Sequence, residues 1–366
     1  MAKKIRVLVV DDSPYSRQTI KGMLETDGEI EIAGIATNGV EAMAKTLRLK
    51  PDMITLDFEM PEMDGFTFLR WLMKERPTPV IMVSSYSDKK TVFTALELGA
   101  ADFIPKPSQR ASADLLRIQD DLLEKVRGIR DLKTDNLGLY RDIVRQDLSA
   151  SSVKDEPSRR TARFHDIDVV AIGASTGGPA AIQVILTSLP ADFPAAILIS
   201  QHMPKGFTGP FAERLNRLSM IRVKEAAEDV TVEKGTALIC PGGCHMIVKE
   251  KNRDVRIMLK SSTAGDAYTP SVDVMMASAA ERFGATTMGV VLTGMGKDGK
   301  KGVVEIKGKG GYTIAESEKT SVVFGMPQEA IKTGAVDRVL PLDEIPMEIT
   351  RVVMSKEDAT WKKNRG

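Results

Sequence analysis

One stretch joins an apolar run to a glycine-rich turn and then to helix-forming residues: Val169-Val170-Ala171-Ile172-Gly173-Ala174-Ser175-Thr176-Gly177-Gly178-Pro179. Continuous apolar runs of this length are typical of parallel strands that are buried on both faces. The pattern places Ser175 at the carboxyl end of a strand and near a helix N-terminus, where open α/β sheets hold ligands. Ser175 is therefore a candidate nucleophile. The turn is equally a candidate phosphate cradle, because backbone N–H groups at helix N-termini favour negative charge.

Length, charge and cysteine content bound the class of protein. The chain has 366 residues, which predicts two domains with a linker rather than a single core. The formal net charge is +1, so bulk charge indicates neither a nucleic-acid partner nor attachment to a membrane surface. No apolar run approaches the roughly 18–20 residues that a membrane span needs. With only Cys240 and Cys244, we expect a cytoplasmic protein of a reducing compartment, without direct membrane insertion.

The N-terminal third alternates short apolar runs with amphipathic stretches. Five units of this kind predict one doubly wound parallel sheet, a flavodoxin-like α/β domain. The expected strands are Ile5–Val10, Ile30–Ala36, Met53–Leu56, Val80–Val83 and Asp102–Ile104. The expected helices are Ser13–Glu25, Gly39–Leu49, Asp64–Lys74, Asp88–Leu98 and one from Gln109 onward.

Polar side chains stand at the carboxyl ends of four of these strands. They are Asp11 and Asp12, Asp57, Ser84 and Lys106, and in a parallel sheet they meet at one edge. Grouped carboxylates repel one another unless a cation joins them, and Mg²⁺ prefers oxygen ligands. An aspartate at such a site can also accept a phosphoryl group. An Asp-Asp pair after a strand is alternatively a helix N-cap, but five residues at matching strand ends favour a shared site.

Three motifs resemble those of response-regulator receiver domains: Val9-Val10-Asp11-Asp12-Ser13, Leu56-Asp57-Phe58-Glu59-Met60-Pro61-Glu62-Met63-Asp64-Gly65 and Lys106-Pro107. The resemblance covers about Lys3 to Lys125 and implies that a partner histidine kinase phosphorylates Asp57. The Mg²⁺ ligands that it implies are Asp11 or Asp12, Asp57 and the backbone of Glu59. The switch residues that it implies are Ser84, Phe103 and Lys106. The Lys106–Pro107 peptide is expected to be cis.

Apolar periodicity weakens after the receiver-like region, where small, polar and charged residues predominate. This composition is typical of a flexible linker, although Leu132–Val144 is expected to form a helical turn or two. The chain therefore divides into domains at residues 3–125 and 166–358, joined by a linker at 126–165. No helix-turn-helix pattern follows the first domain, which argues against a transcription factor.

A second βα series begins at Asp168 and predicts another doubly wound, mostly parallel sheet of Rossmann-like form. The expected strands are Asp168–Gly173, Ala195–Ser200, Arg222–Glu225, Thr236–Cys240, Met288–Thr293, Tyr312–Ala315 and Ala335–Val339. The expected helices are Pro179–Leu189, Phe207–Leu218, Ser271–Phe283, Asp298–Gly308, Pro327–Thr333 and Asp343–Met354. A hairpin is expected between Met246–Lys249 and Asp254–Leu259.

The ends of two further strands bear on the role of the Ser175 turn. A dinucleotide fold requires an acid at the end of the next strand, but the chain has Gln201-His202-Met203-Pro204 there. Imidazole takes a hydroxyl proton near neutral pH, so His202 is a candidate base for Ser175. A later strand leads into Gly294-Met295-Gly296-Lys297-Asp298-Gly299, where Asp298 is the candidate that orients the imidazole.

Each of these residues also has a structural interpretation. A serine in a glycine turn is often only a turn residue, and Asp298 before a helix is often an N-cap. His245 also follows a strand and competes with His202 as the base. Cys240, Cys244 and His245 offer three metal ligands, but they lack the second cluster that is typical of zinc sites.

Four motifs resemble the catalytic domain of chemotaxis methylesterases, the CheB family: Ile172-Gly173-Ala174-Ser175-Thr176-Gly177-Gly178-Pro179, Gln201-His202-Met203-Pro204, Pro270-Ser271-Val272-Asp273 and Leu292-Thr293-Gly294-Met295-Gly296-Lys297-Asp298-Gly299. With the receiver included, the resemblance covers nearly the full chain. It implies Ser175 as nucleophile, His202 as general base and acid, and Asp298 as the partner of His202. It also implies that a backbone N–H near Met295 contributes to an oxyanion hole. No cofactor is expected at this second site.

The implied function is a phosphorylation-activated serine hydrolase that removes methyl esters from glutamates of chemoreceptors and gives adaptation in chemotaxis. Deamidation of receptor glutamines is the expected second activity. Two other classes stay open on the residues alone. One is a receiver fused to a nucleotide-binding module around Ser175, and the other is an inactive adaptor that docks receptors.

Overall fold

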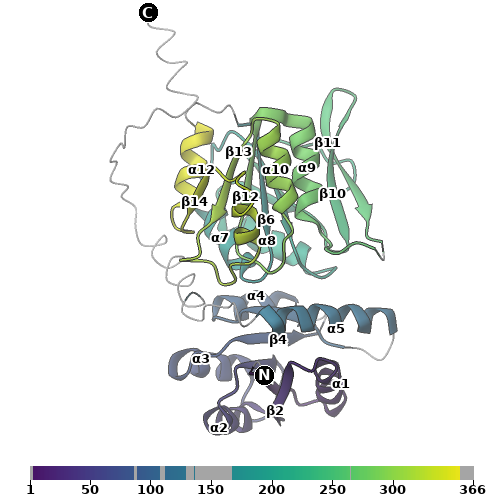
Figure 1. Cartoon of the computed structure of the whole chain (residues 1–366), viewed down its shortest axis with the longest axis vertical. Helices are drawn as coiled ribbons and strands as arrows, with labels where there is room; N and C mark the ends of the chain where they lie inside the picture. The colour runs from purple at the N-terminus through teal and green to yellow at the C-terminus, as the bar shows by residue number, and fades with distance from the viewer. Residues whose placement is uncertain are drawn as a thin grey trace, which may run out of the picture. The chain divides into compact units, whose positions relative to one another are not determined.

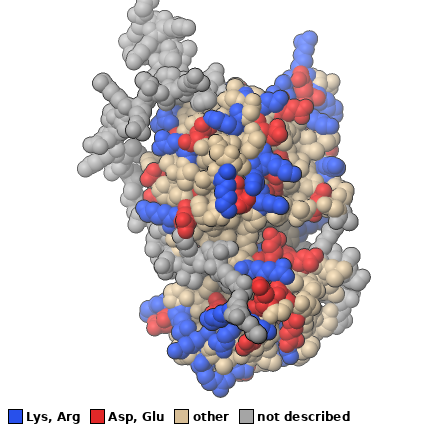
Figure 2. Space-filling model, in the orientation of Figure 1, with Lys and Arg blue, Asp and Glu red and all other residues tan. Residues whose placement is uncertain are grey.

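The computed structural model describes residues 3–85, 89–107, 112–128, 136, 167–263 and 265–354. The chain forms two compact α/β units, Met1–Arg141 and Asp142–Gly366, each with its own parallel sheet (Figure 1). Basic and acidic side chains both occur on the visible face of each unit (Figure 2), in keeping with the net charge of +1. Within the described residues, no helix combines the length and the apolar character needed to cross a membrane.

The first unit is built on a five-stranded parallel sheet in the order β2-β1-β3-β4-β5. Its strands are β1 (Ile5–Val10), β2 (Ile30–Ala36), β3 (Met53–Asp57), β4 (Val80–Ser84) and β5 (Asp102–Pro105). Its helices are α1 (Pro14–Glu25), α2 (Gly39–Leu49), α3 (Gly65–Glu75), α4 (Lys89–Glu97) and α5 (Ser112–Arg127). The strand order reverses between β1 and β3, which opens a ligand crevice outside their carboxyl ends. The predicted flavodoxin-like fold is confirmed.

Helix α3 begins directly beside the end of β3. The Asp64 side chain caps the helix by accepting the N–H of Thr67 at 2.7 Å. Gly65 allows the close approach, since a Cβ added there would lie 2.2 Å from the carbonyl oxygen of Asp57. The loop between Asp57 and α3 is therefore held against the carboxyl edge of the sheet.

The second unit contains a seven-stranded sheet, wholly parallel, in the order β14-β13-β12-β6-β7-β9-β8. Its strands are β6 (Val169–Ala174), β7 (Ala196–Gln201), β8 (Arg222–Glu225), β9 (Thr236–Ile239), β12 (Thr287–Val291), β13 (Tyr312–Glu316) and β14 (Arg338–Leu340). Its helices are α7 (Gly178–Ser188), α8 (Thr208–Leu218), α9 (Val272–Phe283), α10 (Lys300–Gly308), α11 (Met326–Ile331) and α12 (Ile345–Met354), with a 3-10 turn, η3, at Gly284–Thr286. The expected hairpin is the separate antiparallel pair β10 (Cys244–Lys251) and β11 (Asp254–Ser261). The predicted Rossmann-like sheet is confirmed.

Strand β6 lies in the middle of this sheet and is buried along its whole length, as its apolar run predicts. Helices α9 and α10 pack together against the sheet, while α7 contacts α8 and α12 (Figure 1). Helix α9 approaches β6 closely at Gly173, where an added Cβ would lie 2.2 Å from Val272 Cγ1. This contact sets the N-terminus of α9 beside the turn that carries Ser175.

Several predicted boundaries differ by a few residues from those of the structure, and hydrogen bonds or backbone angles explain two of the differences. Helix α10 begins at Lys300 rather than Asp298, because Gly299 adopts a left-handed φ of 92° and stands at the N-cap. Strand β14 begins only at Arg338. The residues just before β14 are not paired with β13 in the parallel ladder. Instead, the Asp337 carboxylate accepts both the N–H and the hydroxyl of Thr313 in β13.

One predicted isomer is also wrong. Within the described residues the cis peptide is Thr269–Pro270, and Lys106–Pro107 is not cis. The trans preference of an X–Pro bond is only about 0.5–1 kcal/mol, so residue type alone does not decide the isomer. The helical turn expected in Leu132–Val144 lies outside the described residues.

Replacing Gly173 with alanine is expected to destabilise the second unit. The new Cβ overlaps Val272, and overpacking of a core typically costs about 1–3 kcal/mol. Gly308→Ala is the matched control, because Gly308 ends α10 with open space where a Cβ would stand. Helix propensity predicts that this control gains up to about 1 kcal/mol.

Scanning calorimetry of the full chain measures both unfolding transitions. Fluorescence of Trp71 in α3, in a Trp361→Phe background, identifies the transition of the first unit. Equal unfolding temperatures of the second unit in the two glycine variants would contradict the close contact at Gly173.

Candidate functional sites

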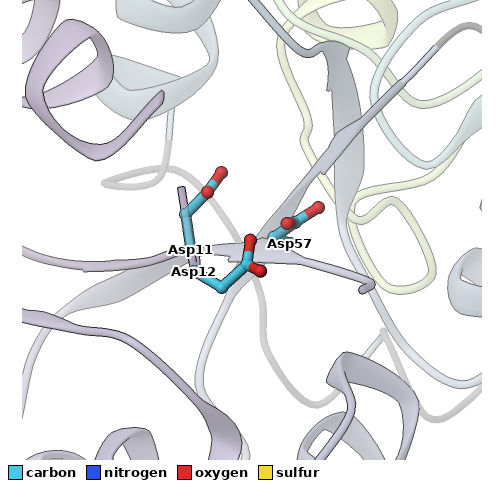
Figure 3. Close-up of side chains that lie close together, drawn as sticks. All are labelled: Asp11, Asp12 and Asp57. Carbon is cyan, nitrogen blue, oxygen red and sulfur yellow. The ribbon is translucent and has the colours of Figure 1, made fainter. Parts of the chain in front are cut away.

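Three carboxylates meet at the carboxyl edge of the first sheet (Figure 3). Asp11 and Asp12 follow β1, and Asp57 ends β3. One oxygen of each lies within 4.8 Å of the others, with Asp11 and Asp57 buried and Asp12 exposed. The convergence predicted from strand ends is confirmed for these residues.

Hydrogen bonds hold this acidic cluster in place. Lys106 Nζ lies 2.6 Å from Asp57 Oδ2 and 3.4 Å from Asp11 Oδ2. Asp11 also accepts the backbone N–H of Ser13 at 2.8 Å and the hydroxyl of Ser16 at 2.6 Å. Lys106 therefore lies where the sequence places it, as the cation beside the aspartates.

The charges of the cluster are unbalanced. The pKa of Asp57 is raised to about 6. Burial is the largest cause and the Asp11 carboxylate adds to it, while the hydrogen bond from Lys106 acts in the opposite direction and lowers the pKa. Burial alone would lower the pKa of Lys106, but its pairing with Asp57 and Asp11 raises it. Three carboxylates facing one ammonium group, with Asp12 open to solvent, suit a hard divalent cation that retains water ligands.

The remaining receiver residues lie around this cluster. Glu59 and Asp12 together line a cavity of about 580 Å³ whose other walls include Phe58, Met60 and Phe66. Ser84 ends β4 and lies opposite Pro105 of β5, while its side chain is outside what the structure describes.

Phe103 is buried in β5 and is fastened to α5 by a residue that the sequence analysis missed. Lys125 Nζ donates to the carbonyl oxygen of Phe103 at 2.7 Å and lies 3.2 Å from Asp102 and 3.1 Å from Asp121. Its burial is the unusual feature, because a lysine on an amphipathic helix normally faces water.

Ser175 and His202 occupy the ends of neighbouring strands in the second unit. Ala174 of β6 lies opposite Gln201 of β7, and the N–H of His202 donates to the carbonyl oxygen of Ala174 at 3.0 Å. The Ser175 carbonyl oxygen accepts Gln201 Nε2 at 2.9 Å and the N–H of Gly178 at 2.8 Å. The backbone on both sides of the Ser175 side chain is therefore fixed.

Asp298 and His202 are in direct contact. His202 Nε2 lies 2.8 Å from Asp298 Oδ2, across 96 residues of sequence. Asp298 also accepts the N–H groups of Val272 at 2.7 Å and Asp273 at 2.9 Å, and the Ser271 hydroxyl at 3.1 Å. Burial alone would raise the pKa of Asp298, but the His202 contact and these backbone N–H groups hold it below its usual value. The lowered pKa favours the ionised acid, and its contact with Nε2 is the one that an orienting partner of the imidazole would make.

This contact assigns the two ring nitrogens of His202. An ionised carboxylate only accepts hydrogen bonds, so Nε2 carries the proton and Nδ1 is the basic nitrogen. Among the described residues, the Ser175 hydroxyl makes no hydrogen bond to His202 or to any other group. Such contacts are often loose in free enzymes and tighten when the substrate binds.

The turn after β12 lies against Ser175. A Cβ added at Gly294 would lie 2.7 Å from Ser175 Cβ, and the Thr293 carbonyl oxygen accepts the N–H of Ser175 at 3.0 Å. Met295 follows and is buried, and within the described chain its N–H donates to no other group. The predicted contributor to an oxyanion hole therefore adjoins the candidate nucleophile.

Glu316 holds the turn after β12 through a hydrogen bond, and the sequence patterns did not predict this role. It is fully buried at the end of β13, where Oε2 accepts the N–H of Thr293 at 2.8 Å and Oε1 accepts the Thr320 hydroxyl at 2.8 Å. Thr293 in turn donates its hydroxyl to the Thr176 carbonyl oxygen at 2.9 Å. Glu316 is thus connected to both turns that surround Ser175.

His245 is engaged away from Ser175. Its Nδ1 accepts the N–H of Ser271 at 3.3 Å, and its Nε2 lies 3.1 Å from Asp266 Oδ2 without good hydrogen-bond alignment. Burial raises the pKa of Cys240, whose thiol contacts the Cys244 carbonyl oxygen. Among the described residues, the acidic cluster of the first unit is the sole group with metal-ligand geometry. Neither the competing base nor the alternative metal site is therefore supported.

Known proteins resemble both units. Residues 170–349 match the family described as CheB methylesterase, and residues 7–116 match the family described as response regulator receiver domain. Protein-glutamate methylesterase/protein-glutamine glutaminase 3 of Geobacter sulfurreducens is 49% identical over 365 residues, covering 95% of this chain and 97% of that protein. The protein-glutamate methylesterase/protein-glutamine glutaminase of Pyrococcus horikoshii is 44% identical, with coverage of 96% and 95%. The crystal structure of the Thermotoga maritima CheB methylesterase catalytic domain covers 51% of this chain and 99% of its own, with 43% identity and a TM-score of 0.50.

Asp57 is expected to make the first unit less stable as the pH rises from about 4 to about 6. Its pKa in the folded chain is about 6, above its ordinary value of 3.8, so the folded state keeps a proton that the unfolded state has lost. The stability of Asp57→Asn relative to the native residue therefore increases over this window and levels off above it. Trp71 fluorescence during urea unfolding, without divalent ions, measures the difference in Trp361→Phe chains.

Saturating Mg²⁺ is expected to shrink this pH-dependent difference, because a cation beside Asp57 favours the charged carboxylate. A difference between Asp57→Asn and the native residue that stays constant from pH 4 to pH 7 would contradict the raised pKa.

Proposed function

The chain belongs to the CheB methylesterase family and carries a response regulator receiver domain, and we propose that it is a phosphorylation-activated hydrolase of glutamate methyl esters on chemoreceptors. The two relatives are named protein-glutamate methylesterase/protein-glutamine glutaminase, and this chain matches each of them over nearly its whole length. The observation that carries the proposal is the 2.8 Å contact of His202 with Asp298, at the strand end next to Ser175.

Ester cleavage begins with a proton transfer. Ser175 Oγ attacks the carbonyl carbon of the ester while Nδ1 of His202 takes the hydroxyl proton. Asp298 keeps Nε2 occupied and stabilises the imidazolium that forms. The N–H of Met295 donates to the oxyanion of the tetrahedral intermediate. The carbon–oxygen bond then breaks, His202 gives its proton to the leaving group, and methanol departs.

Water completes the cycle. His202 takes a proton from a water molecule, which attacks the acyl-Ser175 ester, and the collapse of that intermediate returns the proton to Ser175 Oγ. The product is a free glutamate side chain. The same sequence acting on a glutamine amide releases ammonia instead of methanol, so deamidation is the second activity. These steps need only side chains and backbone of the second unit, without a cofactor.

The first unit is the control element in this proposal. A partner histidine kinase supplies the phosphoryl group, and Asp57 accepts it. Mg²⁺ would be held by Asp11, Asp12, Asp57 and the backbone of Glu59, and it would neutralise charge on the phosphoryl oxygens. Ser84, Phe103 and Lys106 respond to the phosphorylated aspartate as the switch residues.

Regulation uses the division of the chain. The receiver spans residues 3–125, the linker 126–165 and the methylesterase domain 166–358, which contain the two matched regions. In this proposal the unphosphorylated receiver holds the hydrolase in a less active state, and phosphorylation of Asp57 relieves the inhibition. The enzyme acts in the cytoplasm on the receptors' cytoplasmic helices and gives adaptation in chemotaxis.

Two rival classes are separable by binding and labelling. A nucleotide-binding module would bind ATP or NAD detectably by calorimetry. An inactive adaptor would bind receptors, yet Ser175 would fail to react with a fluorophosphonate. The His202–Asp298 pair favours the hydrolase over both, because neither rival requires an oriented imidazole.

Ser175→Ala is expected to lower methanol release from radiolabelled, methylated receptors by at least about a thousandfold, because the nucleophile is removed. Receptor binding is expected to persist. Ser188→Ala is the control, since Ser188 lies at the end of α7 and bonds its own helix at Val184. Near-normal methanol release by Ser175→Ala would sink the assignment.

Asp57→Asn is expected to abolish the stimulation of methanol release by a small-molecule phosphodonor in the presence of Mg²⁺, while unstimulated release stays measurable. Asp52→Asn serves as the control, because Asp52 bonds Lys3 and Arg6 and is not part of the acidic cluster. Stimulation that survives in Asp57→Asn would place the phosphoacceptor elsewhere.

A further inference from the structure

One aromatic ring lies flat against the imidazole of His202. Tyr268, which precedes α9, stacks on that ring with 5.0 Å between centroids and an angle of 8° between planes. Tyr268 is partly buried. Nothing in the mechanism above uses this residue.

The contact of His202 with Asp298 does not by itself fix the plane of the imidazole ring. The imidazole is held at two points, by its bond to Cβ and by the contact of Nε2 with Asp298, and two points fix a line rather than a plane. The His202 side chain is 15% exposed, so the surrounding protein does not enclose it completely. Rotation of the ring about that line would swing Nδ1 away from Ser175. A second ring held parallel to the imidazole removes that rotation, because tilting would break the ring contact.

Tyr268 is itself held from several sides. Its hydroxyl fits against Gly296, where an added Cβ would lie 2.3 Å away, and it accepts the N–H of Lys297 in a weak contact of 3.4 Å. Gly296 and Lys297 belong to the turn that connects Met295 to Asp298. Tyr268 therefore touches both the imidazole and the turn that carries its carboxylate partner.

His245 anchors the backbone around Tyr268. Its imidazole accepts the N–H of Ser271 through Nδ1 and faces Asp266 through Nε2, which places one contact on each side of Tyr268. Asp266 in turn accepts the N–H of Thr263 at 2.6 Å. The buried His245 thus contacts the chain on both sides of Tyr268.

We propose that Tyr268 is a positioning residue for hydrolysis, which sets the plane of the His202 ring so that Nδ1 faces Ser175. The inference rests on the proposed function of the second unit. The ring performs this task and the hydroxyl contributes little, because its contact with Lys297 is long.

The test compares Tyr268→Leu, which removes the ring, with Tyr268→Phe, which keeps it. In the full chain, Tyr268→Leu is expected to lower kcat for methanol release about two- to tenfold, the range that an aromatic pair supplies. KM stays within about twofold, since the ring acts through His202 and not on the substrate. The rate of Ser175 labelling by a fluorophosphonate falls by the same factor, and Tyr268→Phe restores both rates.

Nuclear magnetic resonance tests the stack independently of turnover. The chain has three histidines, His165, His202 and His245, and His202→Gln identifies the resonances of His202. The ring protons of His202 are expected upfield in the native chain and in Tyr268→Phe, and at ordinary positions in Tyr268→Leu. The resonances of His245 stay unchanged and serve as the internal reference.

Three results would overturn the proposal. One is equal loss of activity in Tyr268→Phe and Tyr268→Leu, and another is a rise in KM with kcat unchanged. The third is an unfolding temperature of Tyr268→Leu so low that the fraction of unfolded chain accounts for the slower labelling of Ser175. A native chain that labels at Ser175 but releases neither methanol nor ammonia from receptors would remove the proposed substrate, while the labelling rates and ring shifts still decide the role of Tyr268.

Discussion

Five hydrogen bonds converge on the carboxylate of Asp298, and the arrangement of the second unit depends on them. The first turn of α9 has N–H groups that no helical carbonyl can accept, and Asp298 takes two of them. The same carboxylate contacts the imidazole of His202 at the end of β7. Since α9 packs on β6 at Gly173, this one buried carboxylate connects α9, and through α9 the sheet, to the candidate base. Its charge is also favoured by the positive end of the helix dipole.

Asp57 and Asp298 are two buried aspartates whose pKa values move in opposite directions. Burial outweighs the Lys106 contact at Asp57 and raises its pKa, with Asp11 adding repulsion. Burial is outweighed at Asp298, where His202 and backbone N–H groups lower the pKa. The first carboxylate is poised to gain a cation or a covalent group, whereas the second stays charged and unreactive. Since the residue type is the same, the difference lies in the surroundings: Asp298 accepts five hydrogen bonds, whereas Asp57 has fewer donors and a neighbouring carboxylate, Asp11.

Much of the site is predictable, because parallel strands bring their carboxyl ends to one edge. Ser175, His202 and Asp298 follow from that rule, and the His202–Asp298 contact forms as the rule suggests. Glu316, Tyr268 and Lys125 do not follow from it. Glu316 resembles an ordinary last residue of a strand, Tyr268 lies in an irregular segment whose path depends on tertiary packing, and Lys125 occupies a helix position that usually faces solvent. Their roles depend on burial and on contacts distant in sequence, which residue patterns do not encode.

The strand order also has a consequence for synthesis. Ser175 and His202 come from β6 and β7, whereas Asp298 follows β12 on the opposite side of β6, 96 residues after His202. A growing polypeptide leaves the ribosome N-terminus first, so the serine and the imidazole emerge long before the carboxylate. An unfinished chain holds the imidazole without its carboxylate partner. In the proposed mechanism, esterase competence therefore arises only when translation has supplied nearly the entire domain.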